Sequence, residues 1–192
     1  MDPRDKAEID RLTELTNIGA GHAAGAFAQL IGRTIWTDVP VVSEGDPHVA
    51  QRASVSGDDS ERWCTGVFFE FDGCIDALIG ILFPGAASEA LVRRIVGIET
   101  GELSPSLIES ALMEVGNILA SHVASAIADT LEARLLPSIP LLAMEDAERA
   151  FSAWIEERVG SDDVRIECGL HDEGFELRGR LVMVPMPASQ PS

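Results

Sequence analysis

The strongest constraint on this fold is that the sequence repeats itself with an offset of one hundred residues. Residues 10–40 align with residues 110–140 without a gap. The chain contains only two asparagines, and they occupy equivalent positions, Asn17 and Asn117. Ten positions are identical in the two copies: Leu12/Leu112, Glu14/Glu114, Asn17/Asn117, Ile18/Ile118, Ala20/Ala120, His22/His122, Ala24/Ala124, Ala26/Ala126, Ala28/Ala128 and Pro40/Pro140. A repeat of this kind in 192 residues predicts one domain made of two homologous halves, about 1–100 and 101–192.

Each copy of the repeat begins with a segment that predicts a long helix. Pro3 stands near the start of the first helix, and Ser104 with Pro105 near the start of the second, as residues favoured at helix N-termini. The first helix should stop around Gly32 and the second before Pro137.

The remainder of each half predicts strands and one further helix. Asp72-Gly73 is a hairpin-type turn, the stretch 172–174 is a turn, and the tail 185–192 lacks periodicity and should be frayed. The expected strands are Val39–Ser43, Cys64–Phe71, Ile75–Phe83, Ile139–Met144, Val164–Leu170 and Phe175–Pro185, and the expected shorter helices are Ala86–Val96 and Glu145–Val159. We therefore expect an α+β fold with pseudo-two-fold symmetry and an antiparallel sheet, with the helices packed on a face of it and Ile75–Phe83 as its central strand.

A helical projection places polar residues of the two repeats on one side and apolar residues on the other. The predicted outward residues are Asp10, Glu14, Asn17 and Gly21 in one helix and Ser110, Glu114, Asn117 and Ser121 in the other. The predicted core residues are Leu12, Gly19, Ala23, Ala26 and Leu30, and Leu112, Leu119, Val123, Ala126 and Thr130. His22 and His122 project near the buried edge, which favours structural histidines over catalytic bases.

Small uncharged residues extend the outward stripe of each helix. They are Gly21, Ala24, Gly25 and Ala28 in the first copy and Ser121, Ala124, Ser125 and Ala128 in the second. Exposed helix positions ordinarily carry Glu, Lys or Arg, and a mid-helix glycine costs about 1 kcal/mol relative to alanine. Two interpretations remain open: a large partner lies against this surface, or a neighbouring helix of the same molecule does.

The composition excludes several functional classes. A formal charge of −18 argues against binding to a nucleic-acid backbone, which requires a basic surface. Cys64, Cys74 and Cys168 lack metal-site spacing and lie in apolar runs, which indicates buried thiols in a reducing compartment. The charged N-terminus and the short apolar run Ala77–Phe83 predict a soluble cytoplasmic protein. Trp36, Trp63 and Trp154 are expected to be packing residues.

The carboxylate and the carboxamide on each helix indicate a specific chemistry. An amide both donates and accepts hydrogen bonds, so it can orient a water molecule without removing its proton. That suits hydrolysis of a labile phosphoryl bond, where in-line placement of water is the main requirement. The sequence has no serine–histidine–acid arrangement, phosphate-binding glycine loop or metal-ligand cluster to accompany the pair. The labile bond and the metal are therefore expected on a partner.

The full pattern is Asp10-x3-Glu14-x2-Asn17-x22-Pro40, matched by Ser110-x3-Glu114-x2-Asn117-x22-Pro140. It resembles the signature of the CheC family of chemotaxis phosphatases, in the group that also contains CheX and FliY. Two complete signatures in one chain fit CheC proper, expected as a monomer, because CheX has one site and dimerises while FliY carries a further domain.

The resemblance implies hydrolysis of the aspartyl phosphate of the response regulator CheY. Glu14 and Glu114 would pair with a receiver lysine, and Asn17 and Asn117 would orient the attacking water. Asp10 and Ser110 would have supporting roles, and Pro40 and Pro140 would set the chain entering a strand. The implied partners are phosphorylated CheY and CheD. No cofactor of its own is implied, and Mg²⁺ is expected on CheY.

Two alternatives stay open beside the phosphatase: a non-catalytic adaptor and, less favoured because the further domain is lacking, a structural part of the flagellar switch. The same helices can serve a non-catalytic adaptor that sequesters phosphorylated CheY or CheD. The helix Glu145–Val159, with Phe151, Trp154 and Ile155, can offer a docking face, although its apolar side is favoured as core.

Overall fold

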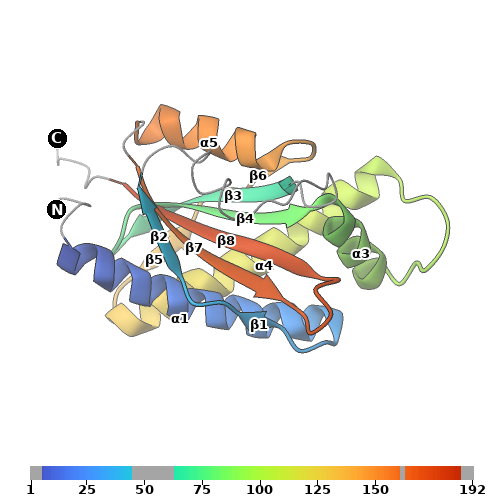
Figure 1. The fold of residues 1–192 in the computed structure, drawn as a ribbon, viewed down its shortest axis with the longest axis horizontal. Coiled ribbons are helices and arrows are strands. Elements are labelled where there is room, and N and C mark those ends of the chain that lie inside the picture. Colours follow the sequence, from blue (N-terminus) through green and yellow to red (C-terminus); the bar gives the residue numbers. More distant parts are fainter. Residues whose placement is uncertain (1–5, 45–62, 161–162, 187–192) are drawn as a thin grey trace.

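The structure, a computed structural model, has three layers and describes residues 6–44, 63–160 and 163–186. Two long helices, α1 (Lys6–Ile31) and α4 (Pro105–Leu131), cover one face of an eight-stranded sheet, and α5 (Ala147–Arg158) covers the other (Figure 1). A further helix, α3 (Gly85–Val96), lies at one end. The predicted helix start at Pro3, the polar loop at 45–62 and the tail beyond Met186 lie outside the described residues.

The sheet is antiparallel throughout and confirms the expected mixed helix-and-sheet fold. Its strands follow the order β1-β7-β8-β4-β3-β5, with β2 further along β7 and β6 further along β3. Their bounds are β1 (Trp36–Thr37), β2 (Val41–Glu44), β3 (Trp63–Gly73), β4 (Ala77–Pro84), β5 (Leu135–Pro137), β6 (Leu141–Ala143), β7 (Val164–His171) and β8 (Arg178–Pro185). All eight residues of β4 are buried, so the apolar run predicted as the central strand holds that place.

The two repeats exchange their edge strands. β1 and β2, from the first half, pair with β7 of the second half. β5 and β6, from the second half, pair with β3 of the first half. One continuous sheet thus interleaves strands from both repeats, and its outer strand on each side belongs to the opposite half.

Several local predictions differ from the structure. The β3–β4 turn lies at Cys74–Asp76, because Asp72 and Gly73 still pair with β5. The two-residue β1 and three-residue β5 are too short to show alternation and were not predicted. α5 lies on the sheet face opposite α1 and α4, not with them. Its Phe151 and Ile155 are buried in a separate core, which confirms the interpretation of that side as core.

Each long helix begins or ends with a recognisable signal. Ser104 accepts a hydrogen bond from the Leu107 N–H at 3.3 Å and Pro105 occupies the first turn of α4, as the sequence predicted. Gly32 follows α1 in the left-handed conformation at φ 65°, and Glu132, its equivalent, adopts φ 49° after α4. The second copy therefore keeps the geometry of the first without the glycine that favours it.

The main core lies between the two long helices and the sheet. α1 approaches α4 closely at Gly19, where a Cβ atom would lie 2.9 Å from Val123 Cγ1. α4 approaches β3 at Gly116, where a Cβ atom would lie 2.5 Å from Val67 Cγ1. In this way each repeat helix packs on the sheet and on its counterpart, which holds both at fixed positions.

Cysteine and tryptophan predictions are confirmed only in part. All three cysteines are free thiols; Cys168 is buried, while Cys64 and Cys74 are half-buried. Burial, followed by the nearby Asp38 carboxylate, raises the pKa of Cys168 to about 11. Trp36 is 57% exposed because it lies on an edge strand, so the packing role predicted for it is wrong.

Candidate functional site: paired Glu–Asn surfaces on two helices

The internal repeat extends to side-chain burial. From residue 12 to residue 29, every position of α1 has the same degree of burial as its counterpart from 112 to 129 of α4. This includes positions where the residue itself differs, such as Gly21 and Ser121, which are both exposed. The two helices therefore present equivalent surfaces to solvent.

The predicted site residues lie on those surfaces. Glu14, Asn17, Glu114 and Asn117 are all exposed, and so are Asp10 and Ser110. Among the described residues, none of these six side chains makes a hydrogen bond or ion pair within the molecule. Residues three apart on a helix have Cβ atoms about 5–6 Å from one another, so each glutamate and asparagine form one compact pair. We call these the Glu–Asn pairs.

Each Glu–Asn pair lies toward the outer flank of the helix pair. Gly19 contacts α4, and Asn17 projects about 200° from Gly19, so it faces away from α4. On that outer side α1 packs against β1 and β7, and α4 correspondingly packs against β3, β5 and β6. Ala24 projects within about 20° of Asn17 yet is 5% exposed, which places Asn17 at the margin between exposed helix and packed sheet edge.

Part of the predicted outward stripe of small residues is wrong, because the sheet edge covers it. Ala24 and Ala124 are buried, and Ala28 and Ala128 are half-buried, because the sheet edge covers that side of each helix. Thr130, predicted in the core, is exposed. The glycines and serines of the stripe, Gly21, Gly25, Ser121 and Ser125, are exposed as predicted.

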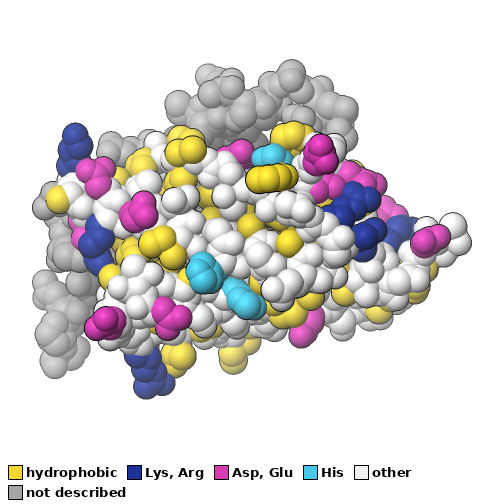
Figure 2. Space-filling view, turned by 90° about the horizontal axis from the view of Figure 1, so that it is seen from below, with side chains coloured by type: hydrophobic (Ala, Val, Ile, Leu, Met, Phe, Trp, Pro, Cys, Tyr) yellow, Lys and Arg dark blue, Asp and Glu magenta, His cyan; other side chains and the backbone are white. Residues whose placement is uncertain are grey.

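The two repeated histidines are exposed, contrary to the prediction. The exposed arc of each helix is centred nearer Glu14 and Gly25 than Asn17, and it therefore includes His22. Figure 2 shows two histidine side chains side by side on the face formed by α1 and α4, with charged side chains gathered toward the ends of that face. The Glu–Asn pairs thus flank a central region of small residues and histidine.

Pro40 and Pro140 occupy equivalent places in the two outer strands. Residues 35–44 and 135–144 form what we call the edge segments, each a short strand, a three-residue break and a second short strand. Pro40 directly precedes β2 and Pro140 directly precedes β6. The Asp38 N–H donates to the Gly169 carbonyl at 3.0 Å, and the Ser138 N–H donates to the Glu70 carbonyl at 2.8 Å.

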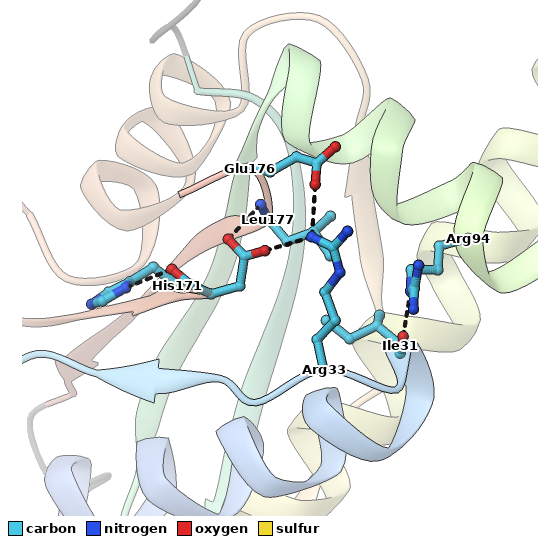
Figure 3. A network of polar contacts seen from close by, with 7 residues as sticks. Ile31, Arg33, Arg94, His171, Glu176 and Leu177 are labelled. Carbon is cyan, nitrogen blue, oxygen red and sulfur yellow. Dashed lines mark hydrogen bonds and ion pairs between the residues drawn. The ribbon is translucent and has the colours of Figure 1, made fainter. Parts of the chain in front are cut away.

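A polar network ties the end of α1 to the β7–β8 turn (Figure 3). Arg33 Nη1 contacts Asp172 at 2.7 Å and Glu176 at 2.6 Å, and Arg94 Nε donates to the Ile31 carbonyl. Burial by itself raises the pKa of Asp172, but the Leu177 N–H and Arg33 outweigh it, so its pKa is lowered. This network positions the helix end and is separate from the Glu–Asn pairs.

The surroundings of the Glu–Asn pairs suit a large partner. An open depression of about 650 Å³ lies where α1 and α3 end, lined by Arg33, Arg93 and Arg94, and neither pair lines it. In the parts of the chain that the structure describes, no three His, Cys, Asp or Glu side chains are placed to hold a metal ion. Exposed side chains outside a pocket can be enclosed only when another macromolecule covers them.

In the described chain, α4 alone is long and apolar enough to cross a membrane by length and composition. However, 56% of its apolar window is buried inside the fold. The helix therefore has the character of a core helix in a globular protein.

The two segments that carry the duplicated surface match a known family model. The CheC-like family model matches residues 8–44 and 107–140, the two segments that carry the Glu–Asn pairs and the following prolines. The chain is therefore similar to the CheC-like family over these two segments.

Individual relatives agree with that similarity. The chain is 27% identical over 193 aligned residues to the CheY-P phosphatase CheC of Bacillus subtilis, covering 93% of this chain and 88% of the relative. FliY of Thermotoga maritima has the same fold, with a TM-score of 0.66, 18% identity, and coverage of 96% and 91%. A chain of the CheX–CheY–BeF3–Mg²⁺ complex of Borrelia burgdorferi gives a TM-score of 0.60 at 10% identity, with coverage of 90% and 97%.

Proposed function

We propose that this chemotaxis protein is a phosphatase that hydrolyses the aspartyl phosphate of a CheY-type receiver domain. The observation that carries the proposal is the pair of equivalent Glu–Asn surfaces, which are exposed and have no hydrogen-bond or ion-pair partner among the described residues. The relative named CheY-P phosphatase CheC supports the activity, and the CheX–CheY complex supports a receiver as partner for this fold.

In the proposed mechanism, Asn17 and Asn117 each enter the phosphoacceptor site of a bound receiver. The amide holds a water molecule through one donated and one accepted hydrogen bond and aligns it with the aspartyl phosphorus. The phosphorus–oxygen bond to the aspartyl side chain breaks as water oxygen attacks, releasing inorganic phosphate and regenerating the carboxylate. Because the amide takes no proton, its contribution is orientation.

Glu14 and Glu114 fix the register of the bound receiver. A carboxylate one helical turn from the asparagine can form a charge-assisted hydrogen bond with a receiver lysine, close to the reacting group. Asp10 and Ser110 lie one turn further along and support that contact. Mg²⁺ belongs to the receiver in this proposal, and the phosphatase contributes no cofactor. The proposal also includes a cytoplasmic location, a monomeric chain and binding of CheD.

The test is phosphate release from phosphorylated receiver with the Asn17→Ala/Asn117→Ala variant. Because both asparagines are exposed and have no partner in the part of the chain that the structure describes, the variant should retain the wild-type unfolding transition, while release should fall to the receiver's own rate. Gln29→Ala, at an exposed position of α1 away from the pairs, is the matched control and should retain full turnover. Undiminished release in the double variant would refute the mechanism.

A non-catalytic adaptor is the second candidate, and the small-residue surface at Gly21, Gly25, Ser121 and Ser125 favours it. Such a surface permits close approach of a partner whatever chemistry follows. Under this alternative the wild-type protein binds phosphorylated receiver or CheD without accelerating phosphate release. Binding and release measured on the same samples separate the two functions.

A further inference from the structure

Exposed large apolar side chains concentrate in the two edge segments. Nine such residues occur in the part of the chain that the structure describes, and eight of them lie in residues 35–44 and 135–144. They are Trp36, Val39, Val41 and Val42 in one segment and Leu136, Ile139, Leu141 and Met144 in the other; the ninth is Phe175. Concentrated exposed apolar surface on a soluble fold is typical of an interaction site.

The exposed residues follow the internal repeat. Positions 36, 39 and 41 correspond to 136, 139 and 141, and at each pair both residues are apolar and exposed although their identities differ. Ile35 and Leu135, which precede them, are both buried. The two edge segments therefore share one arrangement, in which a buried anchor is followed by outward apolar residues.

The break at each proline explains why one residue projects furthest. Proline has no backbone N–H, so it interrupts the pairing of an outer strand and separates β1 from β2 and β5 from β6. Val39 and Ile139, immediately before the prolines, are 84% and 87% exposed, the largest values among the exposed large apolar residues described. The backbone on their N-terminal side is fixed to β7 and β3 by the Asp38 and Ser138 N–H groups.

The length of the returning chain places each projecting residue at about the level of a Glu–Asn pair along the helix axis. After α1 ends, the chain turns and runs back along the helix (Figure 1). Six residues of extended chain from Arg33 to Val39 span about 20 Å, which corresponds to about 13 residues of helix. Val39 therefore returns to the level of about residue 18, on the outer flank where Asn17 lies. The same spacing brings Ile139 back to about the level of residue 118 of α4.

We propose that Val39 and Ile139, with the apolar residues around them, are the docking contacts that hold the receiver domain over each Glu–Asn pair. This proposal rests on the phosphatase function proposed above. A receiver with an apolar surface beside its acidic phosphoacceptor pocket fits: the pocket receives the asparagine, and the apolar surface covers the edge segment.

Two arguments support a receiver domain as the partner that binds the edge segments. The apolar positions recur with each Glu–Asn pair at the same spacing, which is the pattern required when one kind of partner must bind identically at both. In addition, one glutamate and one asparagine supply much less than the roughly 600 Å² per partner found in small specific interfaces. Apolar contacts next to the pair provide the missing area without adding charge to a chain whose net charge is −18.

The test is the Val39→Ser/Ile139→Ser variant of the full-length protein. Both side chains are largely exposed, so the fold should be retained, which the unfolding transition checks. KM for phosphorylated receiver should rise about tenfold with kcat unchanged, since an interface anchor is lost and the reacting groups are not. The Kd for BeF3-loaded receiver should rise by the same factor. An unchanged KM and Kd would overturn the proposal.

Controls separate this proposal from the proposed function. Phe175→Ser removes an exposed apolar side chain outside the edge segments and should leave KM and Kd unchanged. Asn17→Ala/Asn117→Ala should abolish turnover while retaining binding of BeF3-loaded receiver. If that variant keeps full turnover, the catalytic proposal fails, whereas a raised Kd in the Val39/Ile139 variant still supports docking.

Self-association is the competing outcome. If the edge segments instead join two copies of this chain, the serine variant will shift a concentration-dependent dimer to monomer in light scattering while KM and Kd stay at wild-type values. That result would overturn the docking proposal.

Discussion

At the scale of single residues, the side chains proposed to act on a receiver have no hydrogen-bond or ion-pair partner within the described molecule, whereas side chains with a structural role have such partners. Glu14 and Asn17 make no interaction within the described molecule, as expected of groups reserved for a partner. Asp172, by contrast, is almost completely buried and is held by the Leu177 N–H and by Arg33. Its lowered pKa expresses the stability that the charged form gains from those contacts.

We expect Asp172→Asn to lower the free energy of unfolding by about 1 kcal/mol at pH 7. A carboxyl group whose pKa is lowered in the folded state stabilises the protein above the unfolded-state pKa of about 4, and that contribution is lost as pH falls through the folded-state value. The difference between wild type and variant should therefore be constant near neutrality and shrink below about pH 4.

Urea unfolding at pH 7 and pH 3 measures this difference. Glu176→Gln is the matched control, since Glu176 contacts the same arginine but its side chain is 62% exposed. It should change stability by less than about 0.5 kcal/mol at either pH. A difference for Asp172→Asn that grows as pH falls would contradict the assignment.

At the scale of elements, each long helix has a packed face, where an added side-chain atom would clash, and an exposed face, where it would not. A Cβ atom at Gly116 would meet Val67 side-chain atoms at 2.5–2.8 Å, whereas one at Gly25 would have nothing within 4 Å. Packing thus requires glycine at position 116 but not at position 25.

Alanine substitutions at these glycines should have opposite effects. Gly116→Ala should destabilise the protein by about 1–3 kcal/mol through overpacking against β3. Gly25→Ala should stabilise it by about 0.5–1 kcal/mol, because alanine favours the helix and nothing obstructs it. Thermal or denaturant unfolding of the two variants beside wild type decides the matter; destabilisation by Gly25→Ala would show that the exposed face is packed.

Local periodicity was sufficient to predict the helices but not their surroundings. The end of α1 at Ile31, the start of α4 at Pro105, the cap at Ser104 and the exposure of Glu14 and Asn17 follow from helical spacing and capping preferences. The burial of Ala24 and the exposure of His22 do not, because they depend on which side of the helix meets the sheet edge. β1 and β5 were missed because strands of two and three residues carry no measurable alternation.

At the scale of the whole molecule, the chain joins two equivalent surfaces in one fold. α1 and α4 have matching burial over 18 consecutive positions, and each is followed by an edge segment with matching exposed residues. The repeat was evident in the sequence, but the pairing of each edge segment with the opposite half was not, since it joins residues as distant as Trp36 and His171.

Equivalent surfaces predict equivalent contributions to the proposed activity. Asn17→Ala and Asn117→Ala, each made singly, should retain about half of the wild-type turnover at saturating receiver, because the other site is unaffected. Titration of BeF3-loaded receiver should give two binding events per wild-type chain. Loss of nearly all turnover in one single variant, with almost none lost in the other, would show that only one repeat is active.

The exchange of edge strands has a consequence for how the two repeats can change over time. Val41 to Glu44, in the edge segment that follows α1, are held by β7, which the carboxyl-terminal repeat supplies. The counterpart in the edge segment that follows α4 is held by β3, from the amino-terminal repeat. A change in either half therefore reaches the edge segment of the other half. Neither repeat can therefore be lost, or diverge freely in sequence, while the other repeat keeps its structure.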